Sequence, residues 1–302
     1  MYDLIIIGGG PGGVAAGVYA ARKKIKALII AESFGGQSIV SADVQNWIGD
    51  ISISGFDLAE KLEKHLRAQE GIEIQGGDLV LGVEKIEGGF RLKTRAGQTY
   101  ETKFVLLASG SRRKKLGVPG EKELDGKGVV YCSTCDAPIF AGKKTVVVGG
   151  GNAGLEAVRD LIPYAADITL LIRSELKGDQ STFDKVMANP KVHVIQNVEP
   201  VRVIGDKLVT GLEYRDRTSG ATTTLPVEGV FVEIGAVPNA EFVAGLVELD
   251  PRGQVMVDHK TQATSCPGIW AVGDVSDVLY KQNNISAGDG VKAALNIYGS
   301  CI

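Results

Sequence analysis

The sequence predicts an α/β protein made of two Rossmann-like nucleotide-binding domains of the three-layer ββα type, with the second domain inserted into the first. A glycine-rich turn, residues 8–13, follows an apolar run at the start of the chain, and nearly the same pattern returns at residues 149–154. Short apolar or alternating runs with strand character lie between and after these turns. The 302 residues are also enough for two domains of ordinary size.

The first repeat has the order strand, turn, helix, strand. The apolar run Leu4–Ile7 predicts a buried strand that ends at the turn, and small and apolar residues at helical spacing predict a helix over residues 14–24. A second apolar run, residues 26–31, stops at Glu32 and predicts a parallel strand. Together these segments predict a βαβ unit of the kind that binds dinucleotides.

The residue types in this unit suit a dinucleotide. Gly8, Gly10 and Gly13 permit a tight turn, close approach of the backbone to a pyrophosphate, and tight packing of helix on strand. Glu32 follows Gly8 by 24 residues, where a carboxylate can accept hydrogen bonds from ribose hydroxyls. A glycine turn alone can serve packing only, but strand, turn, helix, strand and acid agree here.

The second repeat predicts a second dinucleotide. Residues 144–148 predict a strand, residues 155–164 a helix and residues 167–172 a further strand, with glycine at the first, third and sixth positions of the turn between. The residue 24 positions after Gly149 is Arg173, where NADH-binding units carry an acid.

The coenzyme of the second unit stays open between NADPH and NADH. Arg173 can accommodate a 2′-phosphate, which favours NADPH, but it is equally consistent with an exposed cation at a strand end. Gly154 as the third glycine favours NADH, because alanine is frequent there in enzymes that prefer the phosphorylated coenzyme.

The rest of the chain predicts mostly strands. Strands are predicted over residues 79–83, 90–94, 99–107, 192–195, 201–204, 208–214 and 268–274, and a terminal helix over residues 286–298. Two stretches, residues 110–119 and 235–239, have the composition of domain crossings. If both are hinges, one domain comprises residues 1–113 plus 238–302, and residues 114–237 form the inserted domain.

A CxxC motif followed by a carboxylate, Cys132-Ser133-Thr134-Cys135-Asp136, lies in the inserted domain. Such a pair can close and reopen a disulfide, which predicts electron transfer. The alternative, half of a zinc site, lacks a second pair of ligands, because the other cysteines and the histidines are isolated in the sequence, and no metal is expected. Asp136 is either a general acid or a cap of the following turn.

Composition and charge point to small molecules or a soluble protein as partners. Charged residues make up 23% of the chain and the net charge is −3, so neither nucleic acid nor a membrane surface is expected. The apolar N-terminal strand lacks the pattern of a signal peptide, four cysteines are too few for a disulfide scaffold, and no apolar run reaches about 18 residues. A cytoplasmic protein is expected.

Several motifs together give the chain a family resemblance. They are the GGGPGG turn, Gly35-Gly36-Gln37, Asn46-Trp47 near Gly49, the motif Cys132 to Asp136, GGGNAGLEA from Gly149, Gly211 to Asp216, Gly273-Asp274 and Tyr280-Lys281-Gln282. On these residues the whole chain resembles the low-molecular-weight bacterial thioredoxin reductases, and most closely the reductase portion of the alkyl hydroperoxide reductase flavoprotein.

The resemblance implies an FAD-dependent disulfide reductase that takes electrons from NAD(P)H. It places FAD in the first domain and NADPH or NADH in the inserted domain, with Cys135 beside the flavin, Cys132 attacking the partner disulfide and Asp136 as the acid. The implied FAD residues are Gly8, Gly10, Pro11, Gly13, Glu32, Gly36, Gln37, Asn46, Gly110, Asp274 and Gln282, and the implied NAD(P)H residues are Gly149, Gly151, Asn152, Gly154 and Arg173. A homodimer and domain rotation are also implied.

The chain departs from the family at the coenzyme site and at its start. The basic residues of NADPH-using members are reduced to Ile172-Arg173-Ser174 with Lys177, and the acid of NADH-using relatives is absent. Without amino-terminal thioredoxin-like domains, electrons are expected to leave to a separate thioredoxin-like or glutaredoxin-like protein. The alternative is a non-functional NAD(P)H site, in a ferredoxin-dependent flavin thioredoxin reductase or a flavin dithiol oxidase.

Overall fold

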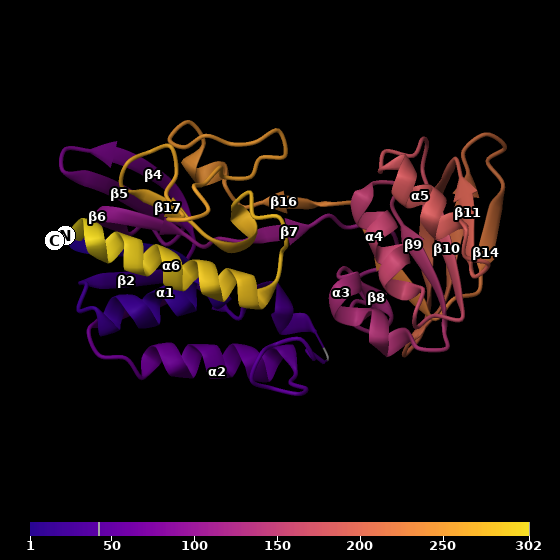
Figure 1. The fold of residues 1–302 in the computed structure, drawn as a ribbon, viewed down its shortest axis with the longest axis horizontal. Coiled ribbons are helices and arrows are strands. Elements are labelled where there is room, and N and C mark those ends of the chain that lie inside the picture. Colours follow the sequence, from indigo (N-terminus) through magenta and orange to yellow (C-terminus); the bar gives the residue numbers. More distant parts are fainter. Residues whose placement is uncertain (42, 302) are drawn as a thin grey trace. The chain divides into compact units, whose positions relative to one another are not determined.

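The chain forms two compact α/β units, so the predicted fold class is confirmed. The computed structural model describes residues 1–41 and 43–301 (Figure 1). Met1–Arg112 and Val237–Ile302 form unit 1, and Arg113–Ala236 form unit 2. The chain crosses between the units in two paired strands, β7 (Ser111–Arg113) and β16 (Ala236–Pro238). The division predicted from composition lies one residue away at each crossing.

Unit 1 is built on a seven-stranded mixed sheet. Its parallel part contains β3 (Ile72–Gly76), β2 (Ala27–Phe34), β1 (Tyr2–Gly9), β6 (Thr99–Leu107) and β17 (Ile269–Ala271). The antiparallel part contains β4 (Val80–Ile86) and β5 (Gly89–Thr94). The first half of β6 pairs with β5 and its second half with β17, so one strand joins both parts.

Helices cover one face of this sheet, and α1 (Pro11–Arg22) lies beside α6 (Asn283–Cys301) (Figure 1). Their backbones approach closely, because a Cβ at Gly290 would lie 2.1 Å from the carbonyl oxygen of Gly12. Apolar residues of both helices and of β1 and β2 form one core cluster. The remaining helices of this unit are α2 (Gly55–Arg67) and the short 3₁₀ helices Gly36–Val40, Glu241–Val243 and Gly273–Val275.

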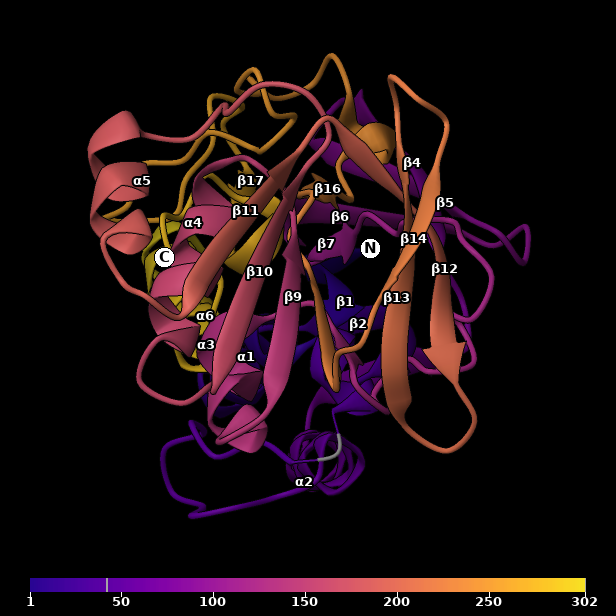
Figure 2. The same cartoon turned by 90° about the vertical axis from the view of Figure 1, so that its right-hand side faces the viewer.

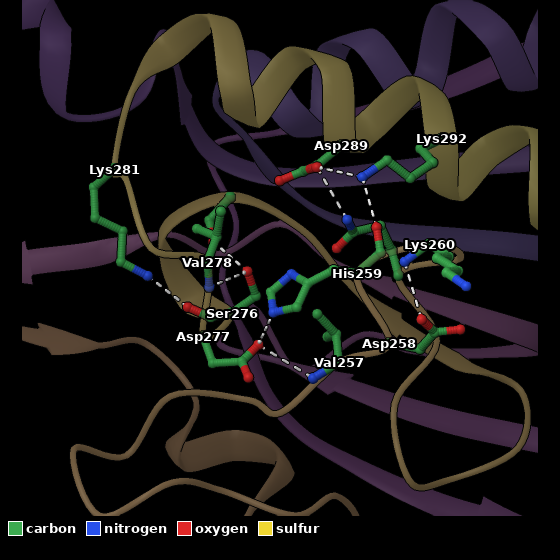
Figure 3. Close-up of polar contacts among 12 residues, drawn as sticks. Val257, Asp258, His259, Lys260, Ser276, Asp277, Val278, Lys281, Asp289 and Lys292 are labelled. Atoms are coloured by element: carbon green, nitrogen blue, oxygen red, sulfur yellow. Dashed lines mark hydrogen bonds and ion pairs between the residues drawn. The ribbon is translucent and has the colours of Figure 1, made fainter.

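A polar cluster attaches the segment before α6 to that helix (Figure 3). The Asp289 carboxylate accepts hydrogen bonds from Gln262 and Lys292, each at 3.0 Å. His259 lies 3.5 Å from Asp277, and its carbonyl accepts from Lys292. These contacts hold residues 257–277, which include the Gly-Asp turn after β17, against the rest of unit 1.

Unit 2 has a five-stranded parallel sheet at its centre (Figure 2). Its order is β11 (Val192–Gln196), β10 (Asp167–Ile172), β9 (Lys144–Val148), β15 (Gly229–Val232) and β8 (Val129–Val130). Helices α4 (Asn152–Leu161) and α5 (Gln180–Met187) pack on one face. The antiparallel sheet of β12 (Val198–Gly205), β13 (Val209–Asp216) and β14 (Thr222–Leu225) packs on the other. The four-residue helix α3 (Ser133–Asp136) and the 3₁₀ helix Ala137–Phe140 precede β9.

The sequence expectations missed the strands β3 and β15 and two helices. Both α2 and α5 begin at a residue whose side chain accepts a hydrogen bond from the first turn, Ser54 and Asp179 respectively. These caps were readable signals. The strand β2 also continues to Phe34, so Glu32 lies within the strand rather than at its tip.

Candidate functional site

The first glycine turn holds α1 against the sheet. Gly8 has φ +113°, and a Cβ there would lie 2.2 Å from the carbonyl oxygen of Ala108 on the neighbouring strand end. A Cβ at Gly13 would lie 2.0 Å from the carbonyl oxygen of Gly8. Gly10 has no such neighbour, because its nearest contact is the Gly36 Cα at 3.8 Å. Gly8 and Gly13 therefore serve close packing, whereas Gly10 leaves space open to a ligand.

A cavity of about 720 Å³ lies beside this turn, entirely within unit 1. Its lining includes eight of the residues predicted to bind FAD: Gly8, Gly10, Pro11, Glu32, Gly36, Gln37, Gly110 and Asp274. Gly13, Asn46 and Gln282 are not part of the lining. A cavity of this size is within the range of sites for large cofactors.

Hydrogen bonds connect the predicted residues from distant parts of the chain. Gln37 Nε2 donates to Asp274 Oδ2 at 3.0 Å and to Ser111 Oγ at 3.2 Å. Asn46 Nδ2 donates to Gln282 Oε1 at 3.3 Å. The first pair lies at the cavity, and the second pair links the segment before α2 to the segment before α6.

Glu32 is not isolated at the cavity wall. Its Oε1 lies 2.7 Å from Nη1 of Arg95, and both side chains are about half exposed (54% and 51%), so the pair is screened by solvent. Arg95 belongs to the turn between β5 and β6, and no signal in the sequence connects it with Glu32. A ribose hydroxyl can still donate to the second oxygen of this carboxylate.

A buried carboxylate that sequence reasoning missed supports the fit of a nucleotide. Asp78 lines the cavity, and its Oδ1 accepts hydrogen bonds from the backbone N–H groups of Leu79 and Ala96. A hydrogen bond from Thr94, followed by those backbone bonds, holds the pKa of Asp78 below its usual value. Its Oδ2 is buried without a partner among the described residues. A ligand hydroxyl or amino group can satisfy this acceptor, so the lining fits a dinucleotide such as FAD.

The second glycine turn repeats the packing of the first. A Cβ at Gly154 would lie 1.9 Å from the carbonyl oxygen of Gly149, and Gly149 itself has φ +145° with the Glu233 carbonyl 2.2 Å from its Cβ position. Gly151 has open space around it. Glycine at position 154 therefore follows from the packing of α4 on β9, and it carries no information about NADH or NADPH.

The loop that follows β10, residues 173–179, contacts this turn. The backbone N–H groups of Lys177 and Gly178 donate to the carbonyl of Gly150, and the side-chain oxygen of Asn152 accepts from the N–H of Asp179 at 2.8 Å. Asn152, a predicted cofactor residue, thus already binds the loop. The loop brings Lys177 close to the turn where a pyrophosphate would bind.

Arg173 is exposed, and a second arginine lies next to it. Arg217 Nη1 donates to the backbone carbonyl of Arg173 at 3.1 Å. Glu199 lies in the same group of charges, and the hydrogen bond from Arg215, with smaller effects of Arg173 and Arg217, holds its pKa below the usual value. Arg217 follows β13 and is far from Arg173 in sequence, so spacing alone did not identify it.

The CxxC motif forms a disulfide at the start of α3. Cys132 is bonded to Cys135, and Cys132 is the N-cap residue of the helix. Asp160 on α4 accepts hydrogen bonds from the hydroxyls of Ser133 and Thr134, at 2.9 and 3.2 Å. The two residues between the cysteines are therefore anchored to α4, which also starts at the second glycine turn. The part of the chain described by the structure contains no cluster of metal ligands.

Asp136 does not cap the turn that follows it, and its pKa is raised. It precedes the 3₁₀ helix Ala137–Phe140, but its side chain makes no capping hydrogen bond there. Burial raises the pKa of Asp136 to about 7, and the nearby Arg113 guanidinium opposes this effect only in part. A carboxyl of this pKa can both give and take a proton near neutral pH.

This pKa predicts a stability that falls with rising pH. Folding raises the pKa of Asp136 from 3.8 to about 7, so the folded state binds the proton more tightly than the unfolded state. The stabilisation of the fold by this proton is complete below pH 3.8 and is lost as the pH rises through about 7. Asp136→Asn should make the free energy of unfolding depend less on pH. Above pH 7 it should raise this free energy by at most about 4 kcal/mol. Urea unfolding at pH 4 and pH 8 measures this. Parallel curves for the two proteins would contradict it.

Two dinucleotide folds, one cavity that fits FAD and one CxxC disulfide define a class, the flavin-dependent disulfide oxidoreductases. Comparison with known proteins agrees. Residues 2–290 match the family model described as pyridine nucleotide-disulphide oxidoreductase. The chain is 40% identical to the F subunit of alkyl hydroperoxide reductase from Pseudomonas putida and 39% identical to a Bacillus subtilis protein named NADH dehydrogenase. These alignments cover 100% and 98% of this chain, and 58% of each relative.

The solved structures give the same result. Thioredoxin reductase from Streptococcus pyogenes superposes with a TM-score of 0.93 at 32% identity, covering 100% of this chain and 99% of that one. The chain belongs to the pyridine nucleotide-disulphide oxidoreductase family, and its fold is similar to that of the thioredoxin reductases. It spans little more than half the length of the curated relatives it matches.

Proposed function

We propose that the protein carries electrons from NAD(P)H through FAD and the Cys132–Cys135 pair to the disulfide of a small thioredoxin-like or glutaredoxin-like protein. FAD binds in the cavity of unit 1, against Gly10, Glu32 and the Gln37–Asp274 pair. When bound, FAD would link the hydride chemistry of the coenzyme to the two-electron reduction of the disulfide. The observation that carries the proposal is the disulfide in unit 2, joined through α4 to the second glycine turn.

The two cysteines, Asp136 and Asp160 have separate roles in the proposed reaction. In the proposed mechanism, Cys135 would receive the electrons that a bound flavin supplies, and Cys132 would attack the partner disulfide as a thiolate. Asp136 gives a proton to the leaving sulfur, for which a pKa of about 7 is suitable. Asp160 holds Ser133 and Thr134, and so orients the loop that carries both sulfurs.

The coenzyme is proposed to bind at the second glycine turn of unit 2. Arg173 and Arg217 at the neighbouring strand ends favour a 2′-phosphate, and thus NADPH. The name of the Bacillus subtilis relative, NADH dehydrogenase, favours NADH. Both coenzymes are therefore tested.

Anaerobic titration with each coenzyme tests the proposal. Purified protein loaded with FAD should lose its oxidised flavin absorbance after one equivalent of the correct coenzyme for the flavin and a second for the disulfide. In stopped-flow measurements, Arg217→Gln should need about tenfold more NADPH to reach half of its maximal rate of flavin reduction, while the NADH dependence is unchanged, because a lost charge-assisted hydrogen bond weakens only phosphate binding. If neither coenzyme bleaches the flavin, the electron donor is ferredoxin or the enzyme runs as a dithiol oxidase.

Assembly and location belong to the proposal as well. We infer a homodimer with rotation between units 1 and 2 during turnover, as the resemblance implies, and we infer a location in the cytoplasm. Among the described residues, no helix has the length and apolar character that crossing a bilayer requires. Light scattering of the FAD-loaded protein measures the assembly, and a monomer at working concentration would contradict the dimer.

A further inference from the structure

A second buried carboxyl lies beside the CxxC motif, and the mechanism above does not use it. Glu233 directly follows β15, and its side chain is buried with 7% exposure. Its backbone N–H donates to the carbonyl of Val148 at 2.9 Å, and its own carbonyl lies against Gly149 of the second glycine turn. The residue therefore has little freedom to move away from the end of β9.

Glu233 and Cys132 follow the sheet at the same edge, because β15 pairs in parallel with β8 and Phe231 lies opposite Val130. The backbone N–H of Ser133, the residue after Cys132, acts to lower the pKa of the Glu233 carboxyl. The hydroxyl of the same serine donates to Asp160. Asp160 therefore holds the Ser133 side chain, and the Glu233 carboxyl interacts with the backbone of the same residue. Ser133 is the neighbour of Cys132, whose sulfur changes charge on reduction.

The charges around Glu233 leave it poorly neutralised. Burial raises its pKa to about 7, Arg113 opposes the shift, and Asp160 and Glu156 on α4 add to it. Arg113 also faces Asp136, and Arg159 lies 3.7 Å from Asp160. One guanidinium therefore faces two buried carboxyls, so additional negative charge nearby favours protonation of one of them.

We propose that Glu233 takes up a proton when the Cys132–Cys135 disulfide is reduced. Reduction breaks the S–S bond with two electrons from the flavin and leaves one thiol and one thiolate. One proton from solvent goes to the thiol sulfur, and the second goes to the Glu233 carboxylate, which lies beside the new negative charge. The thiolate that attacks the partner disulfide then persists without a net gain of buried charge. This inference rests on the proposed role of the disulfide.

Infrared difference spectroscopy tests the proposal on the FAD-loaded protein. Stoichiometric dithiothreitol reduces the disulfide without pyridine nucleotide, flavin absorbance of the same sample shows whether FAD stays oxidised, and the Cys132→Ser variant treated in the same way supplies the background without a disulfide. At about pH 8, above the pKa of the free residue, the reduced-minus-oxidised spectrum should gain the carbonyl band of a protonated carboxylic acid. Labelling the protein with ¹³C-glutamate should shift this band, and ¹³C-aspartate should not.

Matched variants complete the test. Glu233→Gln keeps an oxygen for the Ser133 N–H, and it should lose the band and take up about one proton fewer per reduced disulfide. Glu123→Gln, at an exposed carboxyl of unit 2 that does not act on Glu233, should behave as wild type. A band that survives in Glu233→Gln, or that shifts only with labelled aspartate, overturns the proposal. The labelling result stands even if Glu233→Gln fails to fold. A disulfide that dithiothreitol cannot reduce would instead overturn the proposed function.

Discussion

Replacing Cys132 with serine is expected to abolish reduction of a protein disulfide, by more than about 1000-fold, and to leave flavin reduction by NAD(P)H intact. A serine hydroxyl cannot form the thiolate that dithiol exchange requires. The residues that line the flavin cavity all belong to unit 1, whereas the CxxC motif belongs to unit 2. Reduction of the flavin should therefore not depend on Cys132. Steady-state turnover with a thioredoxin-like substrate and stopped-flow flavin bleaching measure the two effects separately.

The matched variants distinguish the two sulfurs. Cys135→Ser should form a stable mixed disulfide between Cys132 and the partner, because the resolving sulfur is missing, whereas Cys132→Ser should form none. Cys301→Ser, at an exposed cysteine outside the motif, should keep full turnover. Persistent disulfide turnover in Cys132→Ser, or a trapped partner in that variant, would show that the sulfur roles are assigned wrongly.

The repeats made the fold predictable, because a glycine turn between a strand and a helix is a local pattern. The strands β1, β9 and β10 lie where their apolar runs indicated, and β9 and β10 have the predicted bounds. The helices α2 and α5 were missed although their caps were present. Reading the caps at Ser54 and Asp179 together with the helical spacing after them would have found both.

The surroundings of the disulfide were predictable only where the motif is contiguous. Cys132, Cys135 and Asp136 are adjacent in sequence, whereas Asp160 and Glu233 reach Ser133 from separate elements. Their roles depend on how α4 and β15 pack, and a single carboxylate in an apolar run gives no sign of its neighbours. Glu233 ends the run Gly229–Val232, where a buried strand gives way to an ionisable residue. That change was the one readable signal.

The glycine turns separate positions needed for folding from positions needed for ligands. Gly13→Ala should destabilise unit 1 by about 3 kcal/mol or more, because the new methyl group would lie 2.0 Å from the Gly8 carbonyl oxygen and force α1 away from β1. Gly10→Ala, in the same turn, meets nothing closer than 3.8 Å and has φ −74°, so the fold should tolerate it.

The two variants should therefore fail in different ways. Gly10→Ala should keep wild-type thermal unfolding without FAD but bind FAD about tenfold more weakly or worse, because the methyl group enters the lining of the cavity where backbone meets pyrophosphate. Gly13→Ala should unfold at lower temperature even without FAD. Calorimetry of the two apo-proteins and fluorescence titration with FAD measure this contrast. Equal unfolding temperatures for both would mean that α1 can shift without cost, and that the close contact of Gly13 with Gly8 does not determine where this helix packs.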